Sequence, residues 1–147
     1  MEAFIAFLYE HFVSIIGVLL TTSLVAYLTW RNNFKVRRAN ACVAFRAAVL
    51  SELGSIYPNP AEWPKNIDAF LRSHFTALQI AVENFRPFVP WWKRWLFSRA
   101  WFHYRCSTGR PVDIQCYQHY VDFGDNPNHK AIFYANVSRL LAFANET

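Results

Sequence analysis

The chain has 147 residues, of which 54% are hydrophobic and 17% charged, and its formal net charge is +5. Soluble proteins average roughly 45–50% hydrophobic and about 25% charged residues, so this composition argues against an ordinary soluble protein. The length is enough for one domain and an anchor, and it excludes two enzymatic domains.

Residues 12–30 contain no charge over nineteen positions, and they predict a transmembrane helix. At ~1.5 Å per residue such a helix is about 28 Å long, close to the ~30 Å hydrocarbon thickness of a bilayer. Tyr27 and Trp30 stand at its end, where interfacial aromatic residues are common. A cleaved signal peptide would need a basic start and a small-residue cleavage site, whereas this chain begins Met1-Glu2. A buried core helix would be shorter and apolar on one face only.

Charged residues around this helix predict its orientation. Glu2 and Glu10 precede it, and a basic collar over residues 31–38 follows it. The positive-inside rule therefore predicts a short extracytoplasmic N-terminus (residues 1–11) and a cytoplasmic domain (residues 39–147). We expect the bilayer, with its anionic inner leaflet, to be a partner of the residues at this boundary, which are Trp30, Arg31, Lys35, Arg37 and Arg38.

Small residues also mark one face of the predicted membrane helix. Ser14, Gly17 and Thr21 lie at spacings of three and four, as residues at contacts between membrane helices often do. We expect a homo-oligomer or a subunit of a larger membrane complex.

The cytoplasmic part predicts an all-α fold, a small bundle of about four helices without strand alternation. Residues at helical spacing predict three of the helices: one over residues 39–57 (Cys42, Phe45, Val49, Leu53 and Ile56), one over residues 65–85 (Ile67, Leu71, Phe75, Leu78, Val82 and Phe85), and a last helix (Ile132, Phe133, Asn136, Val137, Leu140 and Leu141). A further helix is expected over residues 91–105 and a short one over 114–120. The helix over 39–57 can continue directly from the membrane helix. Prolines separate the helices expected over residues 39–57, 65–85 and 91–105. A turn is expected at residues 108–111, and Asp125 or Asn126 is expected to cap the last helix, with Pro127 just inside it.

The segment over residues 85–106 is the least usual part of the chain. It contains four of the six tryptophans and five of the fifteen Lys and Arg residues, and no carboxylate. Three interpretations compete: a stacking platform for nucleic acid, a membrane-surface element, or a helix packed in the core or against another subunit. The modest net charge disfavours nucleic acid. We expect one packed face and one face at the membrane interface, formed by Trp91, Trp92, Lys93, Arg94 and Trp95.

One set of residues has the spacing of metal ligands. His103 and Cys106 are separated by two residues, as are Cys116 and His119, and nine residues lie between the pairs. Thiolates and imidazoles in this arrangement can hold a structural zinc ion. The alternative is two buried cysteines and two partly exposed histidines. We expect no cofactor and no disulfide in the reducing cytoplasm, with structural zinc as the alternative.

No arrangement of nucleophile, base and acid, and no phosphate-binding loop, points to catalysis. Arg99 and His103 are similar to the Arg and His pair of helical nucleases of the HEPN class, but the three residues between them are fewer than that class has. We therefore expect that the protein is not an enzyme.

Residues 57–64 (YPNPAEWP), 70–95 and 99–110 resemble a group of small single-pass bacterial proteins of uncharacterised function. The resemblance covers about Phe45 to Tyr120 and implies the bacterial inner membrane, without any activity. A looser similarity, of architecture only, is to membrane effectors of phage defence, which oligomerise into pores. Our leading expectation is a non-enzymatic, membrane-anchored helical protein that self-associates or serves a membrane assembly. The alternative is a pore-forming or defence effector whose cytoplasmic domain senses a trigger such as RNA.

Overall fold

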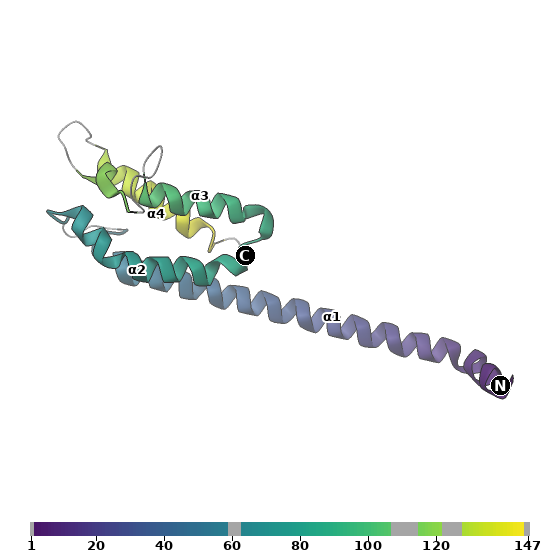
Figure 1. Ribbon diagram of the computed structural model, residues 1–147. Coiled ribbons are helices and arrows are strands. Elements are labelled where there is room, and N and C mark those ends of the chain that lie inside the picture. The colour runs from purple at the N-terminus through teal and green to yellow at the C-terminus, as the bar shows by residue number, and fades with distance from the viewer. Residues whose placement is uncertain (1, 59–62, 107–114, 122–127, 146–147) are drawn as a thin grey trace. The chain divides into compact units, whose positions relative to one another are not determined.

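The computed structural model describes residues 2–58, 63–106, 115–121 and 128–145, and in these residues the protein is all-α, as predicted (Figure 1). The helices are α1 (Glu2–Leu53), α2 (Ile67–Phe85), α3 (Arg94–Arg105) and α4 (His129–Ala142). Three short 3₁₀ turns accompany them: η1 (Arg86–Phe88), η2 (Trp91–Lys93) and η3 (Tyr117–Tyr120). The chain divides into two compact units, unit 1 (Met1–Arg38) and unit 2 (Ala39–Thr147).

Unit 1 is part of α1, which is the one helix within the described residues that is long and apolar enough to cross a membrane. No side chain of its apolar window is buried in the protein. Two threonine hydroxyls within it are nevertheless paired: Thr21 Oγ1 donates to Gly17 O at 2.8 Å, and Thr22 Oγ1 donates to Val18 O at 2.7 Å. Because these polar groups bond back to the helix itself, they need no water.

Unit 2 confirms the predicted apolar faces. The residues predicted for the first cytoplasmic helix are all buried: Cys42, Phe45, Val49, Leu53 and Ile56. In α2 the predicted face is buried except for Phe75, which is half-buried and stacks on Trp101 with ring centroids 6.1 Å apart. Helix α2 begins at Ile67 because the side chain of Asn66 caps it, accepting a hydrogen bond from Ala69 N at 3.0 Å.

Later boundaries differ by a few residues from the predictions. Residues 91–93 form a 3₁₀ turn, so that α3 begins only at Arg94. The helix expected over residues 114–120 is the turn η3, and α4 begins at His129. The expected turn at 108–111 and the expected capping residues 125–127 lie outside the described residues.

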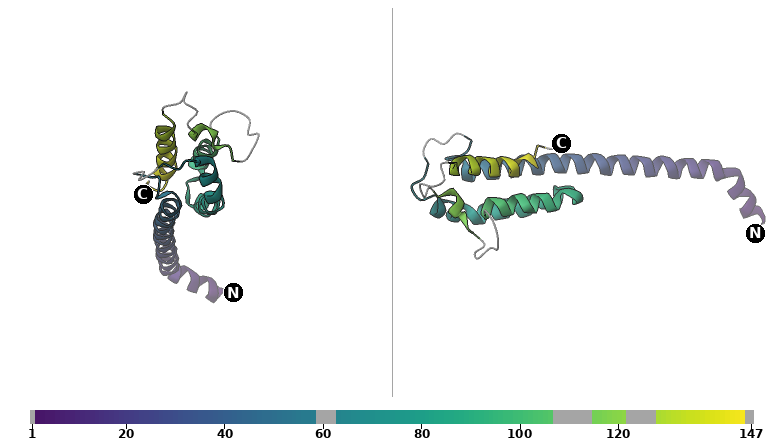
Figure 2. Two further views of the ribbon diagram at one scale, coloured as in Figure 1. Left: turned by 90° about the vertical axis from the view of Figure 1, so that its left-hand side faces the viewer. Right: turned by 90° about the horizontal axis from the view of Figure 1, so that it is seen from above.

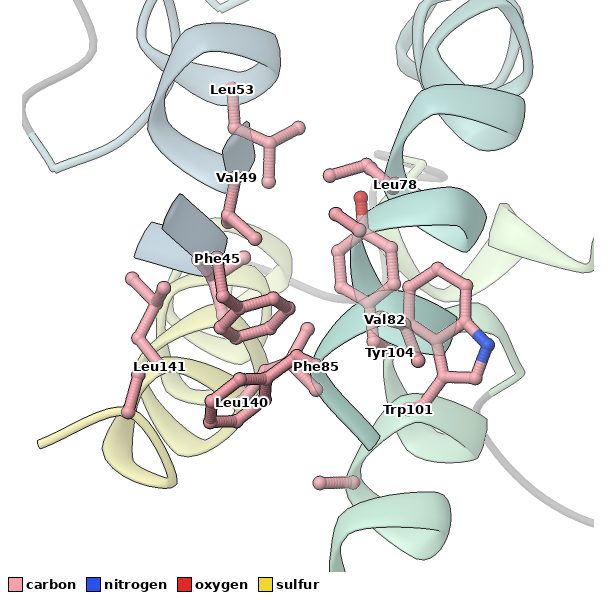
Figure 3. Packing of buried hydrophobic residues seen from close by; sticks show 14 of the residues in the cluster. Phe45, Val49, Leu53, Leu78, Val82, Phe85, Trp101, Tyr104, Leu140 and Leu141 are labelled. Carbon is pink, nitrogen blue, oxygen red and sulfur yellow. The ribbon is translucent and has the colours of Figure 1, made fainter. Parts of the chain in front are cut away.

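Aromatic rings form the centre of the unit 2 core. Phe45 of α1 stacks on Phe85 of α2 at a centroid distance of 4.5 Å. Phe97 of α3 meets both rings edge-on, at 6.0 and 5.6 Å, and also meets Phe143, just after α4, at 5.3 Å. Figures 2 and 3 show the helices of unit 2 side by side, with Phe45 and Phe85 facing each other. One ring of α3, Phe97, thus contacts rings of α1 and α2 and the ring that directly follows α4.

A buried hydrogen-bond chain links η3, α3 and α4. Asn136 Nδ2 donates to Tyr120 Oη at 3.0 Å, and Tyr120 Oη donates to Tyr104 O at 3.0 Å. Burial raises the pKa of Tyr120, although the hydrogen bond from Asn136 opposes this shift. The hydroxyl therefore keeps the proton that it donates.

Candidate functional site

Helix α3 and the turn before it have two distinct faces. Phe97, Ala100, Trp101 and Tyr104 are buried in the core. The opposite surface exposes Trp91 by 76%, Trp92 by 62%, Trp95 by 65% and Leu96 by 44%. We call these four exposed residues the tryptophan patch. Single exposed apolar side chains are normal, but four neighbouring ones indicate a surface that something else covers.

The backbone beneath the tryptophan patch is well braced. Lys93 N donates to Pro90 O at 2.8 Å, which closes the 3₁₀ turn. The guanidinium of Arg94 donates to two further carbonyls, Val89 O and Pro87 O, each at 3.2 Å. Val89 is itself buried. The tryptophans are thus held outward by a turn that is tied to the core.

Three side chains, Trp95, Arg99 and His103, form a row that leads from the patch along the exposed side of α3. The guanidinium of Arg99 lies 5.6 Å from the ring centroid of Trp95, a cation–π arrangement. Arg99 Nε also donates to His103 Nε2 at 3.3 Å. The Arg and His pair therefore lies one helical turn apart on a helix surface. The prediction that it has no nuclease activity stays a prediction.

The tryptophan patch lies at the end of unit 2 where the chain enters it. Unit 2 begins at Ala39, and Phe45 follows less than two turns later. Phe85 and Phe97, which flank the turn that carries the patch, both contact the ring of Phe45. The turn that carries the tryptophan patch and the first residues of unit 2 are therefore at the same end of the bundle.

The residues predicted for the boundary of the membrane helix are accessible in unit 1. Trp30 is 65% exposed, and Arg31, Lys35 and Arg37 are exposed, whereas Arg38 is half-buried. On the helix surface Ser14, Gly17 and Thr21 are also exposed. A shallow groove runs over this region, lined by Ser14, Ile15, Val18 and Leu19.

The four predicted zinc ligands are close in sequence, but the structure does not bring three or more of them together at one point. Cys106 and Cys116 pair in an isolated parallel β-bridge, with Cys116 N donating to Arg105 O at 3.1 Å. His119 Nδ1 lies 3.1 Å from Cys116 O. Within the described ranges no group of three or more His, Cys, Asp or Glu side chains could hold a metal ion. The expectation of no cofactor, with structural zinc as the alternative, stays a prediction.

His119 should make the stability of unit 2 depend on pH. Burial, aided by repulsion from His103, lowers its pKa from 6.5 to about 4, although the hydrogen bond to Cys116 opposes the shift. Between these two pH values the imidazole of His119 is neutral in the folded protein and protonated in the unfolded chain. The stability of unit 2 therefore falls as the pH decreases from about 6.5 to about 4. We expect a loss of about 1–2 kcal/mol after discounting for the ring's remaining exposure.

Thermal unfolding of the full chain in detergent at several pH values, followed by near-UV circular dichroism, measures this dependence. His119→Gln should remove this part of the dependence. A dependence that is unchanged in His119→Gln would show that His119 is not its source.

A cavity in unit 2 is a feature that no sequence pattern indicates. It measures about 360 Å³ and is lined by Arg46, Leu50, Tyr57, Pro58, Ser138, Leu141 and Asn145. Its polar groups pair with each other: Tyr57 Oη lies 3.0 Å from Ser138 Oγ, and Arg46 donates to Asn145 Oδ1. These partners are up to 99 positions apart in the chain, so spacing alone could not find them.

Comparison with known proteins gives no match to a family model, a curated protein or a solved structure. The resemblance to small single-pass bacterial proteins therefore stays a prediction, and the candidate surfaces are interpreted from their own chemistry.

Proposed function

We propose that this chain is a non-catalytic, single-pass membrane protein that self-associates or forms a subunit of a membrane assembly. Unit 1 is its anchor, and unit 2 lies on the cytoplasmic face of a bacterial inner membrane. The exposed apolar surface of unit 1 carries the proposal, because none of its apolar window is buried in the protein. Exposing such an apolar helix surface to water is unfavourable, whereas the hydrocarbon core of a bilayer matches it in length and polarity.

A signal sequence meets the same criteria of length and composition. Two observations favour a retained anchor. Residues 28–38 are helical, so that no extended segment follows the apolar run. The residues at the end of the run are also large, with Leu28 and Trp30 on either side of Thr29.

The polar atoms of unit 1 support the same proposal. The hydroxyls of Thr21 and Thr22 are bonded to carbonyls of their own helix, as hydroxyls surrounded by lipid must be. The cations Arg31, Lys35 and Arg37 follow the apolar run and are exposed, which favours the cytoplasmic side for unit 2.

Self-association is tested by substitution of Gly17, the smallest residue of the face formed by Ser14, Gly17 and Thr21. A Cβ at Gly17 meets no atom within 4 Å, so Gly17→Ile should leave the monomer undisturbed. In a helix contact it would separate the two backbones. We expect at least a roughly tenfold weaker association, the equivalent of ~1.4 kcal/mol, measured by sedimentation equilibrium in detergent.

Ala26→Ile is the matched control. At about 100° per residue, Ala26 lies on the opposite side of the helix from Gly17, and it is also exposed. It should leave the mass unchanged. A wild-type chain that is monomeric at micromolar concentration would contradict self-association through this helix.

A further inference from the structure

We infer that the tryptophan patch of unit 2 is a second membrane attachment, which inserts into the headgroup region of an anionic leaflet beside the anchor. This inference rests on the proposed function, because unit 1 must first bring unit 2 to the bilayer. It adds a defined docked face to a domain that would otherwise only be tethered.

The chemistry of the patch fits the membrane interface better than an apolar protein groove. Three of its four residues are tryptophan, the side chain that prefers the boundary between headgroups and acyl chains. The T-shaped contact of Trp91 with Trp92, at a centroid distance of 5.8 Å, leaves both rings widely exposed. The braced turn beneath them fixes their direction, so that little conformational entropy is lost on insertion.

The charges around the patch complement an anionic surface. Lys93, Arg94 and Arg99 lie in or next to it, and residues 85–106 contain no carboxylate. The nearest carboxylate in the described part of α2, Glu83, forms an ion pair with Arg86 at 2.9 Å. The other described carboxylates of unit 2, Glu52 and Asp68, lie near the last turn of α1 and the first turn of α2, away from Phe45 and Phe85. Among the residues that the structure describes, the end of unit 2 that carries the patch is therefore the basic end.

The position of the patch supports the choice of the same bilayer. The patch lies at the end of unit 2 where the chain enters, and only the eight residues 31–38 separate that entry from Trp30. Four of these eight residues are Arg or Lys. A short basic connection keeps the entry end of unit 2 at the leaflet surface, where the effective concentration of lipid is high.

Quenching of tryptophan fluorescence by lipids brominated near their headgroups tests the inference on the full chain in vesicles. The vesicles contain phosphatidylcholine with or without phosphatidylglycerol. Docking should expose four of the six tryptophans to the quencher, namely Trp30 and the three of the patch. The variant with Trp91, Trp92 and Trp95 all changed to Ala should retain the quenching of Trp30 alone. Trp30→Phe should lose only that part.

The outcomes separate the two proposals. Unquenched Trp30, measured in the triple variant, overturns the anchor. Quenched Trp30 with no additional quenching from the patch overturns the docking and leaves the anchor intact. A triple variant that lowers the oligomer mass, while the wild-type patch is unquenched, assigns the patch to a second copy of the chain and also overturns the inference.

Charge variants test the requirement for anionic lipid. Each cation removed should lower the ratio of docked to undocked protein roughly fivefold in vesicles with phosphatidylglycerol. Arg99→Gln is the test, and Lys65→Gln, an exposed cation just before α2 and outside the basic end, is the matched control. Patch quenching that is equal with and without phosphatidylglycerol would contradict the role of charge.

Discussion

Leu20→Lys should remove most of the protein from the membrane. Leu20 lies near the middle of residues 12–30 and is 66% exposed, so its side chain would face lipid. Exchanging leucine for lysine at the centre of a membrane helix costs about 3–4 kcal/mol of insertion free energy, a shift of more than roughly a hundredfold. The segment contains five Ser and Thr residues, and this limits its reserve. The fraction that resists extraction of membranes with alkaline carbonate measures the effect.

Val36→Lys is the matched control for this change. Val36 is an exposed apolar residue of the same helix, but it lies within the basic collar, beyond the apolar run. A lysine there meets water and headgroups, so membrane retention should be unchanged. Equal retention of Leu20→Lys and wild type would show that residues 12–30 do not cross the bilayer.

Phe97→Ala should cost about 3–5 kcal/mol of the free energy of unfolding, the range for a large buried aromatic side chain. Phe97 has no exposed surface and contacts Phe45, Phe85 and Phe143. Its loss leaves a cavity beside all three of these rings. Since domains have only about 5–15 kcal/mol of stability in total, this loss removes a large part of the stability of unit 2. Chemical denaturation in detergent, followed by near-UV circular dichroism, measures the change.

Trp95→Ala, two residues earlier on the same helix, is the matched control. Its indole is 65% exposed and contacts Arg99 only through a cation–π interaction. Such an interaction contributes about 0.5–1 kcal/mol at an exposed site, so the loss should stay below about 1 kcal/mol. If both substitutions destabilise equally, the assignment of the two faces of α3 is wrong.

The buried faces of unit 2 could be predicted because they follow one simple period. Apolar residues three and four positions apart, such as Phe45, Val49 and Leu53, point to one side of a helix wherever that helix packs. The same rule predicted the all-α fold. It did not require any knowledge of which helix contacts which.

The orientation of the aromatic segment could not be predicted in the same way. Trp95 and Trp101 have the same side chain, yet one is 65% exposed and the other 2% exposed. Period alone does not distinguish an apolar face that packs from one that remains outside, since both are apolar. The deciding contacts, such as Trp101 Nε1 donating to Gln79 Oε1 at 3.1 Å, come from a different helix.

The turn at residues 91–93 shows a second limit. The prediction of a helix from Trp91 was wrong by one turn, because Lys93 N donates to Pro90 O, three residues earlier, which is the pattern of a 3₁₀ turn. The pairing of Cys106 with Cys116 across residues outside the described ranges is likewise a tertiary contact without a local signal.

The hydrogen-bond chain from Asn136 through Tyr120 to Tyr104 has a consequence for how uniquely unit 2 folds. Apolar faces alone allow neighbouring helices to slide by a turn with little loss of contact area. Such a slide would leave the buried amide of Asn136 and the hydroxyl of Tyr120 without partners, at a cost of about 1–3 kcal/mol for each group. These hydrogen bonds therefore disfavour shifted arrangements of α4 against α3. They select one alignment among several that bury similar apolar area.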